Sequence, residues 1–394
     1  MSLMDIFVVI AKPTKACNAD CSYCSAIPYD KEKWTVEKFM HIWDTLKPGL
    51  NQQVQWIWHG GEPLLMSPEF YTSCYEYAKL THPNVRFEMQ SNITLYKSSR
   101  WKDTIEKVFN GCVSTSFEYG GMRTIFGDAA KFEKVFKWKL KIIIDDGFST
   151  GIIGTYSDRN IDQAVKMYDL AISHDIKAPS IRINYMRPQG RVKDHGVLMS
   201  EHKYTQTLLA LWDRWVNDAP AFDVIPLADF LYSVLGVHKS YKCPYTRSCG
   251  GRFLSVEPNG DLYNCAVSSD TRNKDFSFGN VFDLIVDNKR VPQDAFIQHL
   301  NEAQALRVIK SRRYQVHLDC VKCPHFRECQ GGCPSDSMLF DGSISSKFYY
   351  CETWKALLTK VKEDLAQGKL DRLLKKRGLS PTRYAPGSRA LAFV

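Results

Sequence analysis

Thirteen cysteines occur in this 394-residue chain, and most of them lie at short, fixed spacings. The first three are Cys17, Cys21 and Cys24, in the pattern Cys-x3-Cys-x2-Cys. Thiols at such spacings usually bind metal in a reducing compartment, and an odd count without a secretion segment argues against a disulfide framework. These residues therefore predict a metal site, and the spacing between the cysteines indicates which metal it holds.

Three thiolates on one short loop can hold three irons of a 4Fe–4S cluster and leave the fourth iron without a protein ligand. That open iron can chelate the amino and carboxylate groups of S-adenosylmethionine (SAM), and a reduced cluster can pass an electron into the sulfonium. Homolysis then yields methionine and a 5′-deoxyadenosyl radical, which abstracts a hydrogen atom from the substrate. The alternatives are three unrelated thiols or a structural zinc site, which normally needs four ligands in two pairs.

A glycine-rich segment, Trp58-His59-Gly60-Gly61-Glu62-Pro63, follows one strand–helix unit after the cysteine loop. Taken alone, it could be a plain turn. In this order the two motifs resemble the radical SAM superfamily, whose glycine-rich segment contacts the SAM amino group. The resemblance implies SAM contacts at Gly60, Gly61, Glu62, Ser116, Arg123 (toward the carboxylate) and Tyr23 (beside the adenine). The stretch between Ser116 and Arg123 is shorter than is usual in the family, and Tyr23 could equally be a core or surface tyrosine.

Alternating strand-like and helix-like segments in the first 220 residues or so must position these motifs. Six segments are predicted as strands: Ile6–Ile10, Val54–Trp58, Val85–Gln90, Val113–Phe117, Gly151–Thr155 and Ser180–Asn184. Strands separated by helical crossovers predict an α/β fold with a parallel sheet, curled into a partial (β/α)6 barrel of the TIM type. In such folds the chemistry lies at the carboxyl ends of the strands.

A second cysteine array fills the C-terminal region: Cys243, Cys249, Cys265, Cys320, Cys323, Cys329, Cys333 and Cys351. Its spacing resembles the SPASM domain, the auxiliary-cluster extension of radical SAM enzymes that modify peptides and proteins; zinc knuckles are the alternative. Resemblance to sulfatase-maturing members implies auxiliary cluster I on Cys243, Cys249, Cys265 and Cys333. It implies auxiliary cluster II on Cys320, Cys323, Cys329 and Cys351. The chain would then carry three 4Fe–4S clusters, and Cys74 and Cys112 are expected as buried small hydrophobic residues.

The predicted domains are a radical SAM barrel over residues 1–236, a SPASM domain over 237–355, and a C-terminal helix and tail over 356–394, with the helix running from about Glu352 to Arg377. The net charge is +9, and basic residues are densest from Lys369 to Arg383. A solvated helix face explains that stretch better than nucleic-acid binding, and it would also suit an acidic protein or peptide. Without a signal peptide or a run of about 18 apolar residues, a soluble cytoplasmic protein with no membrane contact is expected.

Three functions fit these motifs. The first is a maturase of ribosomally made peptides, which forms a thioether or carbon–carbon crosslink, such as a cyclophane, or epimerises a residue. The second is an anaerobic sulfatase-maturating enzyme, which makes formylglycine. In that family an aspartate base follows the third C-terminal cysteine, whereas Ala266 follows Cys265 here, and Asp270 is a weak candidate for the base. The third, a non-catalytic iron–sulfur electron-transfer protein, is disfavoured by the open-iron loop and the glycine segment.

The expected partners are a peptide or protein substrate and an external electron donor. Because the cysteine loop begins at residue 17, the sequence leaves no room for the N-terminal winged-helix element that grips the leader peptide in many relatives. Leader recognition would then use the barrel surface, the basic C-terminal helix or a separate leader-peptide-binding protein.

Overall fold

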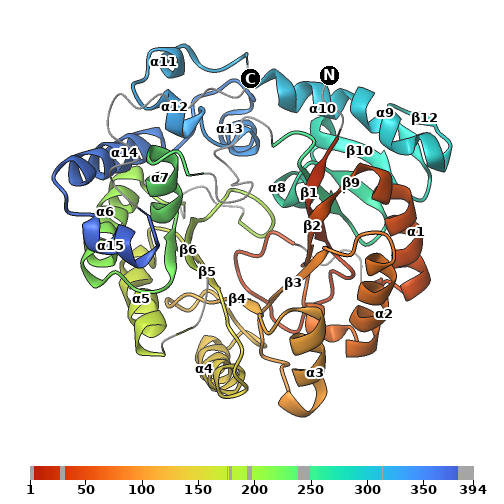
Figure 1. Cartoon of the computed structure of the whole chain (residues 1–394), viewed down its shortest axis with the longest axis horizontal. Coiled ribbons are helices and arrows are strands. Elements are labelled where there is room, and N and C mark those ends of the chain that lie inside the picture. The colour runs from red at the N-terminus through yellow and green to blue at the C-terminus, as the bar shows by residue number, and fades with distance from the viewer. Residues whose placement is uncertain are drawn as a thin grey trace.

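A curved sheet with helices on its outer side forms the body of the molecule (Figure 1). The computed structural model describes residues 4–26, 32–174, 176, 180–192, 198–237, 249–312 and 314–379. Seven neighbouring strands of the sheet are parallel. They are β1 (Ile6–Ala11), β2 (Leu50–Trp58), β3 (Arg86–Ser91), β4 (Ser114–Ser116), β5 (Ile152–Tyr156), β6 (Ser180–Tyr185) and β7 (Asp223–Ile225).

Each of the six predicted strands overlaps an observed one, which confirms the α/β fold with a parallel sheet. The sequence interpretation missed β7, whose three residues are too few to show a period. The helices between these strands are α1 (Val36–Leu46), α2 (Pro68–Lys79), α3 (Ser98–Val108), α4 (Ala129–Asp145), α5 (Ala164–Ser173), α6 (Glu201–Asp218) and α7 (Leu227–Val234).

The outer face of the sheet is buried against these helices through aromatic side chains. Phe39 of α1 meets Trp56 of β2 edge-on, with ring centroids 5.4 Å apart, and it also contacts Trp58 at 5.7 Å. Successive side chains of a strand point to opposite faces, so His59, directly after Trp58, extends toward the concave side. Because the apolar side chains pack against the helices on the outer face of the sheet, the concave face is left for polar groups.

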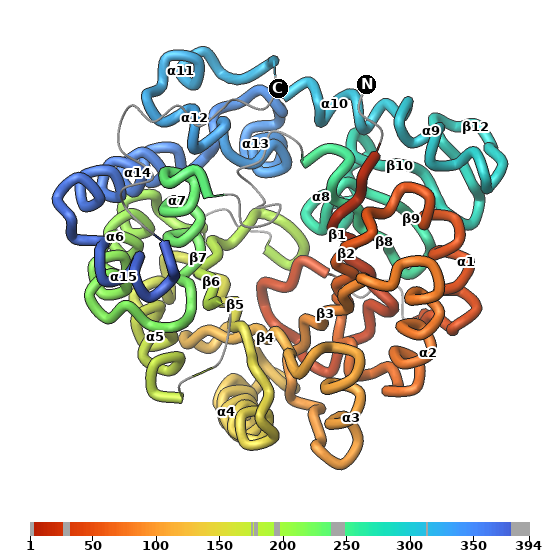
Figure 2. The backbone as a smooth tube through the Cα atoms, viewed as in Figure 1, coloured from red at the N-terminus to blue at the C-terminus, as the bar shows by residue number. Residues whose placement is uncertain are grey.

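The C-terminal region continues the same sheet rather than forming a separate one. β8 (Phe253–Val256) pairs in parallel with β1, and β9 (Asp261–Tyr263) and β10 (Ser277–Asn280) follow antiparallel. Figure 2 shows β1, near the start of the chain, beside β8. The remaining elements here are the hairpin β11 (Ile285–Val286) and β12 (Lys289–Arg290), and the helices α8 (Ala266–Asp270), α9 (Phe296–Glu302), α10 (Gln304–Ser311), α11 (Leu318–Val321), α12 (Phe326–Cys329) and α13 (Pro334–Asp341). The sheet therefore crosses the predicted domain limit near residue 236, and the three domain limits stay predictions.

Two helices follow the last cysteine, α14 (Cys351–Ala366) and α15 (Asp371–Lys376). The expectation of one helix to Arg377 was wrong, because Gly368 adopts a left-handed conformation with φ of 71° that ends the first helix. α14 packs on α6, where the Trp212 indole donates to Asp364 at 2.8 Å. Arg377, from the basic stretch, donates to Asp223 at 3.0 Å, so part of that stretch serves the fold. No helix in the described ranges has the length and apolar character needed to cross a membrane.

Candidate active site

The predicted cluster loop leaves β1 and lies at the carboxyl end of the parallel strands. Its three cysteines are free thiols; Cys17 is exposed, and Cys21 and Cys24 are half-buried. Burial, and after it the neighbouring Cys21, raise the pKa of the Cys24 thiol. Bound iron would deprotonate such thiols outright. Three unpaired thiols on one short loop fit a cluster with one open iron.

Residues from three other strand ends hold this loop. After β6, the Arg191 backbone N–H donates to the Cys24 carbonyl at 3.0 Å, and its guanidinium donates to the Cys21 carbonyl at 3.1 Å. After β3, the Asn92 amide donates to the Asn18 side-chain oxygen at 2.9 Å. After β4, the Gly127 N–H donates to Asp20 at 2.8 Å. These hydrogen bonds to the cluster loop could not be predicted from the spacing of the motifs, because each partner lies on a loop far away in the sequence.

The glycine segment after β2 lies against the start of the cluster loop, as its place in the sequence predicted. The Gly61 N–H donates to the Thr14 carbonyl at 2.9 Å, and the Glu62 N–H donates to the Ala16 carbonyl at 2.8 Å. A Cβ atom on Gly61 would lie 2.0 Å from the Ala16 carbonyl oxygen, so no larger residue fits there. The close approach of the two backbones explains the glycine.

Glu62 is fully buried and accepts three hydrogen bonds. Its carboxylate receives the Ser91 hydroxyl at 2.7 Å and the backbone N–H groups of Leu64 and Asn92 at 2.8 and 2.7 Å. Burial raises the pKa of Glu62 to about 7, against the lowering effect of these donors. The carboxyl thus connects the glycine segment to the end of β3, and it can exchange a proton near neutral pH.

This raised pKa predicts a pH dependence of stability. Between the unfolded pKa of about 4.3 and the folded pKa of about 7, the folded chain binds more protons at Glu62, so stability falls as pH rises through this window. The free energy of unfolding of the wild type minus that of Glu62→Gln should fall by about 3 kcal/mol from pH 4 to pH 8. Denaturant titrations across this range test it. A difference that is flat or rises with pH would contradict the expectation.

Two predicted SAM contacts, Tyr23 and Arg123, meet at a third residue, Glu118. The Tyr23 hydroxyl donates to the Glu118 carboxylate at 2.9 Å, and the Arg123 Nε donates to it at 3.0 Å. The Arg123 guanidinium also lies over the Tyr23 ring, 5.4 Å from its centroid. Glu118 lies two residues after the predicted contact Ser116, yet the sequence interpretation gave it no role. The predicted contact Ser116 accepts from the Gln90 amide at 2.7 Å, at the end of β3.

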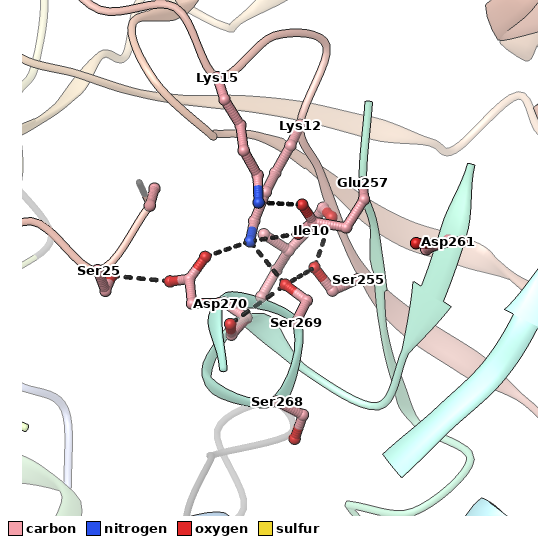
Figure 3. A network of polar contacts seen from close by, with 12 residues as sticks. Ile10, Lys12, Lys15, Ser25, Ser255, Glu257, Asp261, Ser268, Ser269 and Asp270 are labelled. Carbon is pink, nitrogen blue, oxygen red and sulfur yellow. Dashed lines mark hydrogen bonds and ion pairs between the residues drawn. The ribbon is translucent and has the colours of Figure 1, made fainter. Parts of the chain in front are cut away.

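A buried ionic network joins the segment that leads into the cluster loop to α8 and the end of β8 (Figure 3). The Lys12 ammonium donates to Glu257 at 2.7 Å, Asp270 at 2.6 Å and the Ser269 hydroxyl at 2.6 Å, and Lys15 pairs with Glu257 as well. Both lysine side chains have no exposed surface. Burial alone would lower the pKa of Lys12, but the two carboxylates outweigh it and its pKa lies above the ordinary value.

Asp270, the weak candidate for a base, is part of this network. Its second carboxylate oxygen accepts from the hydroxyl of Ser25, directly after Cys24, at 2.7 Å. Burial raises the pKa of Asp270, but the ammonium of Lys12 lowers it further, so the net pKa lies below the ordinary value. A carboxylate held by an ammonium in this way is a poor proton acceptor. Its geometry suits connecting α8 to the cluster loop.

The described cysteines predicted for auxiliary cluster I are Cys249, Cys265 and Cys333; Cys243 lies outside the described residues. Cys265 and Cys333 directly precede α8 and α13, and the Cys265 sulfur lies 3.6 Å from the hydroxyl of Ser335. Helix starts of this kind favour negative charge. α13 also reaches the end of β6, because the buried carboxylate of Asp336 accepts from the Arg187 Nε at 2.6 Å.

The four cysteines predicted for auxiliary cluster II line one pocket: Cys320, Cys323, Cys329 and Cys351. Burial and then Cys351 raise the pKa of Cys329 to about 12, with smaller effects of Cys320 and Cys323. The structure thus gathers these thiols, although their sequence positions span 32 residues. In the described part of the chain no three His, Cys, Asp or Glu side chains converge as ligands of a single metal ion. Cluster ligation therefore stays a prediction.

The two cysteines outside both arrays have different environments. Cys74 of α2 is fully buried in the core, as predicted. Cys112 is only half-buried and pairs with Ser149 through an isolated β-bridge, so the expectation of a core position was wrong for it. Its place at the turn before β4 leaves one side of the residue uncovered.

Comparisons of the sequence and of the structure with known proteins point to the same group of proteins. No protein-family model matches the chain. It is 23% identical over 380 residues to a cysteine-type anaerobic sulfatase-maturating enzyme of Clostridium perfringens, covering 88% of this chain and 94% of the relative. The structure of native anSMEcpe with bound AdoMet and Cp18Cys peptide superposes with a TM-score of 0.75, at 20% identity, over 92% of this chain and 99% of that one. Streptococcus suis SuiB bound to precursor peptide SuiA gives a TM-score of 0.63, at 15% identity, over 89% and 76%.

The chain is an enzyme whose fold, and whose cysteine loop at the end of β1, resemble those of the radical SAM class. Within that class its similarity is to the maturases, which act on proteins or peptides, and this confirms the resemblance seen in the sequence.

Proposed function

We propose that this chain is a radical SAM maturase of ribosomally made peptides, forming a thioether or carbon–carbon crosslink, cyclophanes included. Cys17, Cys21 and Cys24 would hold the SAM cluster, and the two auxiliary clusters would occupy the C-terminal array. When bound, the first cluster supplies the electron that cleaves SAM to the 5′-deoxyadenosyl radical, which removes a hydrogen atom from the substrate. An external electron donor and a cytoplasmic location belong to the same proposal.

The residues of the chain would bind and orient the cofactor. Gly60, Gly61 and Glu62 would receive the SAM amino group, while Glu118 holds Tyr23 and Arg123 in one arrangement for the adenine and carboxylate. The curved sheet and its covering helices would keep water from the radical.

One observation favours a peptide crosslink over formylglycine formation. Residue Ala266 begins α8, where the sulfatase maturases have their aspartate base, and the one carboxylate of α8, Asp270, bonds to Lys12 and Ser25. Formylglycine formation of the kind found in those maturases would therefore lack its base at this position.

Sulfatase maturation is the second candidate, favoured by the relative from Clostridium perfringens. Anaerobically reconstituted protein would be incubated with SAM, dithionite and either the short peptides encoded beside its gene or a peptide with a sulfatase cysteine motif. A peptide that loses two hydrogen atoms, with a crosslink located by fragmentation, supports the first function. Formylglycine in the sulfatase peptide alone supports the second. A Cys17→Ala, Cys21→Ala, Cys24→Ala variant is the control and should form no 5′-deoxyadenosine.

A further inference from the structure

Arg312 is a buried cation that follows α10 and lies among the predicted auxiliary-cluster ligands. It is 6% exposed. Its guanidinium donates to the carbonyls of Gly331 at 2.6 Å, Ser346 at 2.9 Å and Ile344, and to the Ser337 hydroxyl at 3.4 Å. All four acceptors are neutral, so they solvate the charge without balancing it.

A buried charge without a counter-ion is costly, by several kcal/mol. Within the described residues no carboxylate pairs with Arg312, and its buried Nε has no hydrogen-bond partner. The groups that act on its charge are the thiols of Cys320, Cys333 and Cys329, while burial lowers its pKa. A guanidinium nevertheless stays protonated in proteins. Among the described residues, those sulfurs are the groups that can supply its counter-charge once bound iron has deprotonated them.

The position of Arg312 matches the layout of the cysteine array. Gly331, whose carbonyl it binds, lies between Cys329 and Cys333, which are assigned to different auxiliary clusters. The residues Ile344 and Ser346 lie on the loop that leads to Cys351. Two of the three thiols that act on Arg312, Cys320 and Cys329, belong to the set that lines the pocket of auxiliary cluster II.

We propose that Arg312 is the buried counter-charge of auxiliary cluster II, and that it holds the reduction potential of this cluster above the value it would otherwise have. A cluster with four thiolate ligands is anionic, and reduction adds one negative charge, so a fixed cation nearby stabilises the reduced form more. Arg312 acts on the cluster through its charge and is a positioning residue. This inference rests on the proposed function, because it requires the auxiliary clusters.

The test is a redox titration of reconstituted full-length protein, followed by electron paramagnetic resonance. The background carries Cys17→Ala, Cys21→Ala and Cys24→Ala, so that only auxiliary clusters contribute. Arg312→Gln and Arg312→Met remove the charge, and Gln keeps donors for the carbonyls. Each should make reduction of auxiliary cluster II at least about tenfold less favourable, a midpoint lower by about 59 mV for a one-electron couple. Arg312→Lys keeps the charge and should stay within about threefold of the wild type.

The outcomes separate the inference from the proposed function. An unchanged midpoint in Arg312→Gln, at the iron content of the wild type, overturns the inference and leaves the cluster assignment intact. Equal shifts in Arg312→Lys and Arg312→Gln also overturn it, because the role would then lie in holding the loop carbonyls. Background protein without auxiliary iron, measured by iron analysis before any titration, overturns the cluster assignment and the inference with it.

Discussion

Replacing Lys12 with methionine is expected to lower the free energy of unfolding by about 3 to 5 kcal/mol. The substitution removes the only ammonium that bonds to both Glu257 and Asp270 within the described residues, and the methionine fills much of the same space. Lys15 still pairs with Glu257, but among the described residues Asp270 keeps only the Ser25 hydroxyl as a direct donor. A buried carboxylate left without its cation accounts for most of the cost.

Denaturant titration of anaerobically reconstituted protein measures this effect, with Lys141→Met as the matched control. Lys141 pairs with Asp145 at 2.9 Å on the exposed face of α4, and such pairs contribute only about 0.3 to 0.5 kcal/mol. Adding Asp270→Asn to Lys12→Met should restore part of the loss, because the unpaired charge disappears. Equal midpoints for Lys12→Met and Lys141→Met would show that the buried network contributes no more than a surface pair.

Gly61→Ala is expected to reduce 5′-deoxyadenosine formation at least about 100-fold, because misplacing catalytic parts by about 1 Å can have an effect of that size. The new methyl group would lie 2.0 Å from the Ala16 carbonyl oxygen and 2.6 Å from the carbonyl carbon of Lys15. Both are backbone atoms, so the segment before Cys17 must move. The hydrogen bond from the Glu62 N–H to Ala16 would lengthen with it.

The measurement pairs product analysis by chromatography with iron content. If the SAM cluster is lost and the auxiliary clusters stay, iron should fall by about a third. Gly147→Ala is the control, since its φ is 89° but no atom lies within 4 Å of the added carbon. That substitution strains the backbone by about 1 to 2 kcal/mol without touching the site. Wild-type product yield from Gly61→Ala would refute the expected displacement of the loop.

Features whose parts lie close together in the chain could be predicted from the sequence. The cysteine loop, the glycine segment and the six strands depend on local spacing or periodicity, and the structure has them in the expected order. The ionic network depends on Lys12 bonding to residues 245 and 258 positions away, and no periodicity carries that information. The same limit applies to Glu118 and Arg312, whose roles follow from neighbours on other loops.

The break between α14 and α15 shows a second limit. Residues 352–377 have a helical composition throughout, and one glycine within such a pattern is usually tolerated. Here Gly368 takes a left-handed conformation, and α15 then packs so that Leu373 and Leu374 are buried. Tertiary packing decided between a continuous helix and a turn, and the local pattern could not.

The pairing of β1 with β8 also constrains how the chain reaches its folded state. β1 has β2 on one side and β8 on the other, and about 240 residues separate β1 from β8. During synthesis from the N-terminus, one edge of the strand that leads into the cysteine loop stays unpaired until residues 253–256 emerge from the ribosome. Unpaired strand edges promote aggregation, and pairings between distant segments form slowly. We therefore expect a nascent chain of this protein to expose this edge until β8 is made, and faster synthesis or a chaperone that covers the edge to reduce its aggregation.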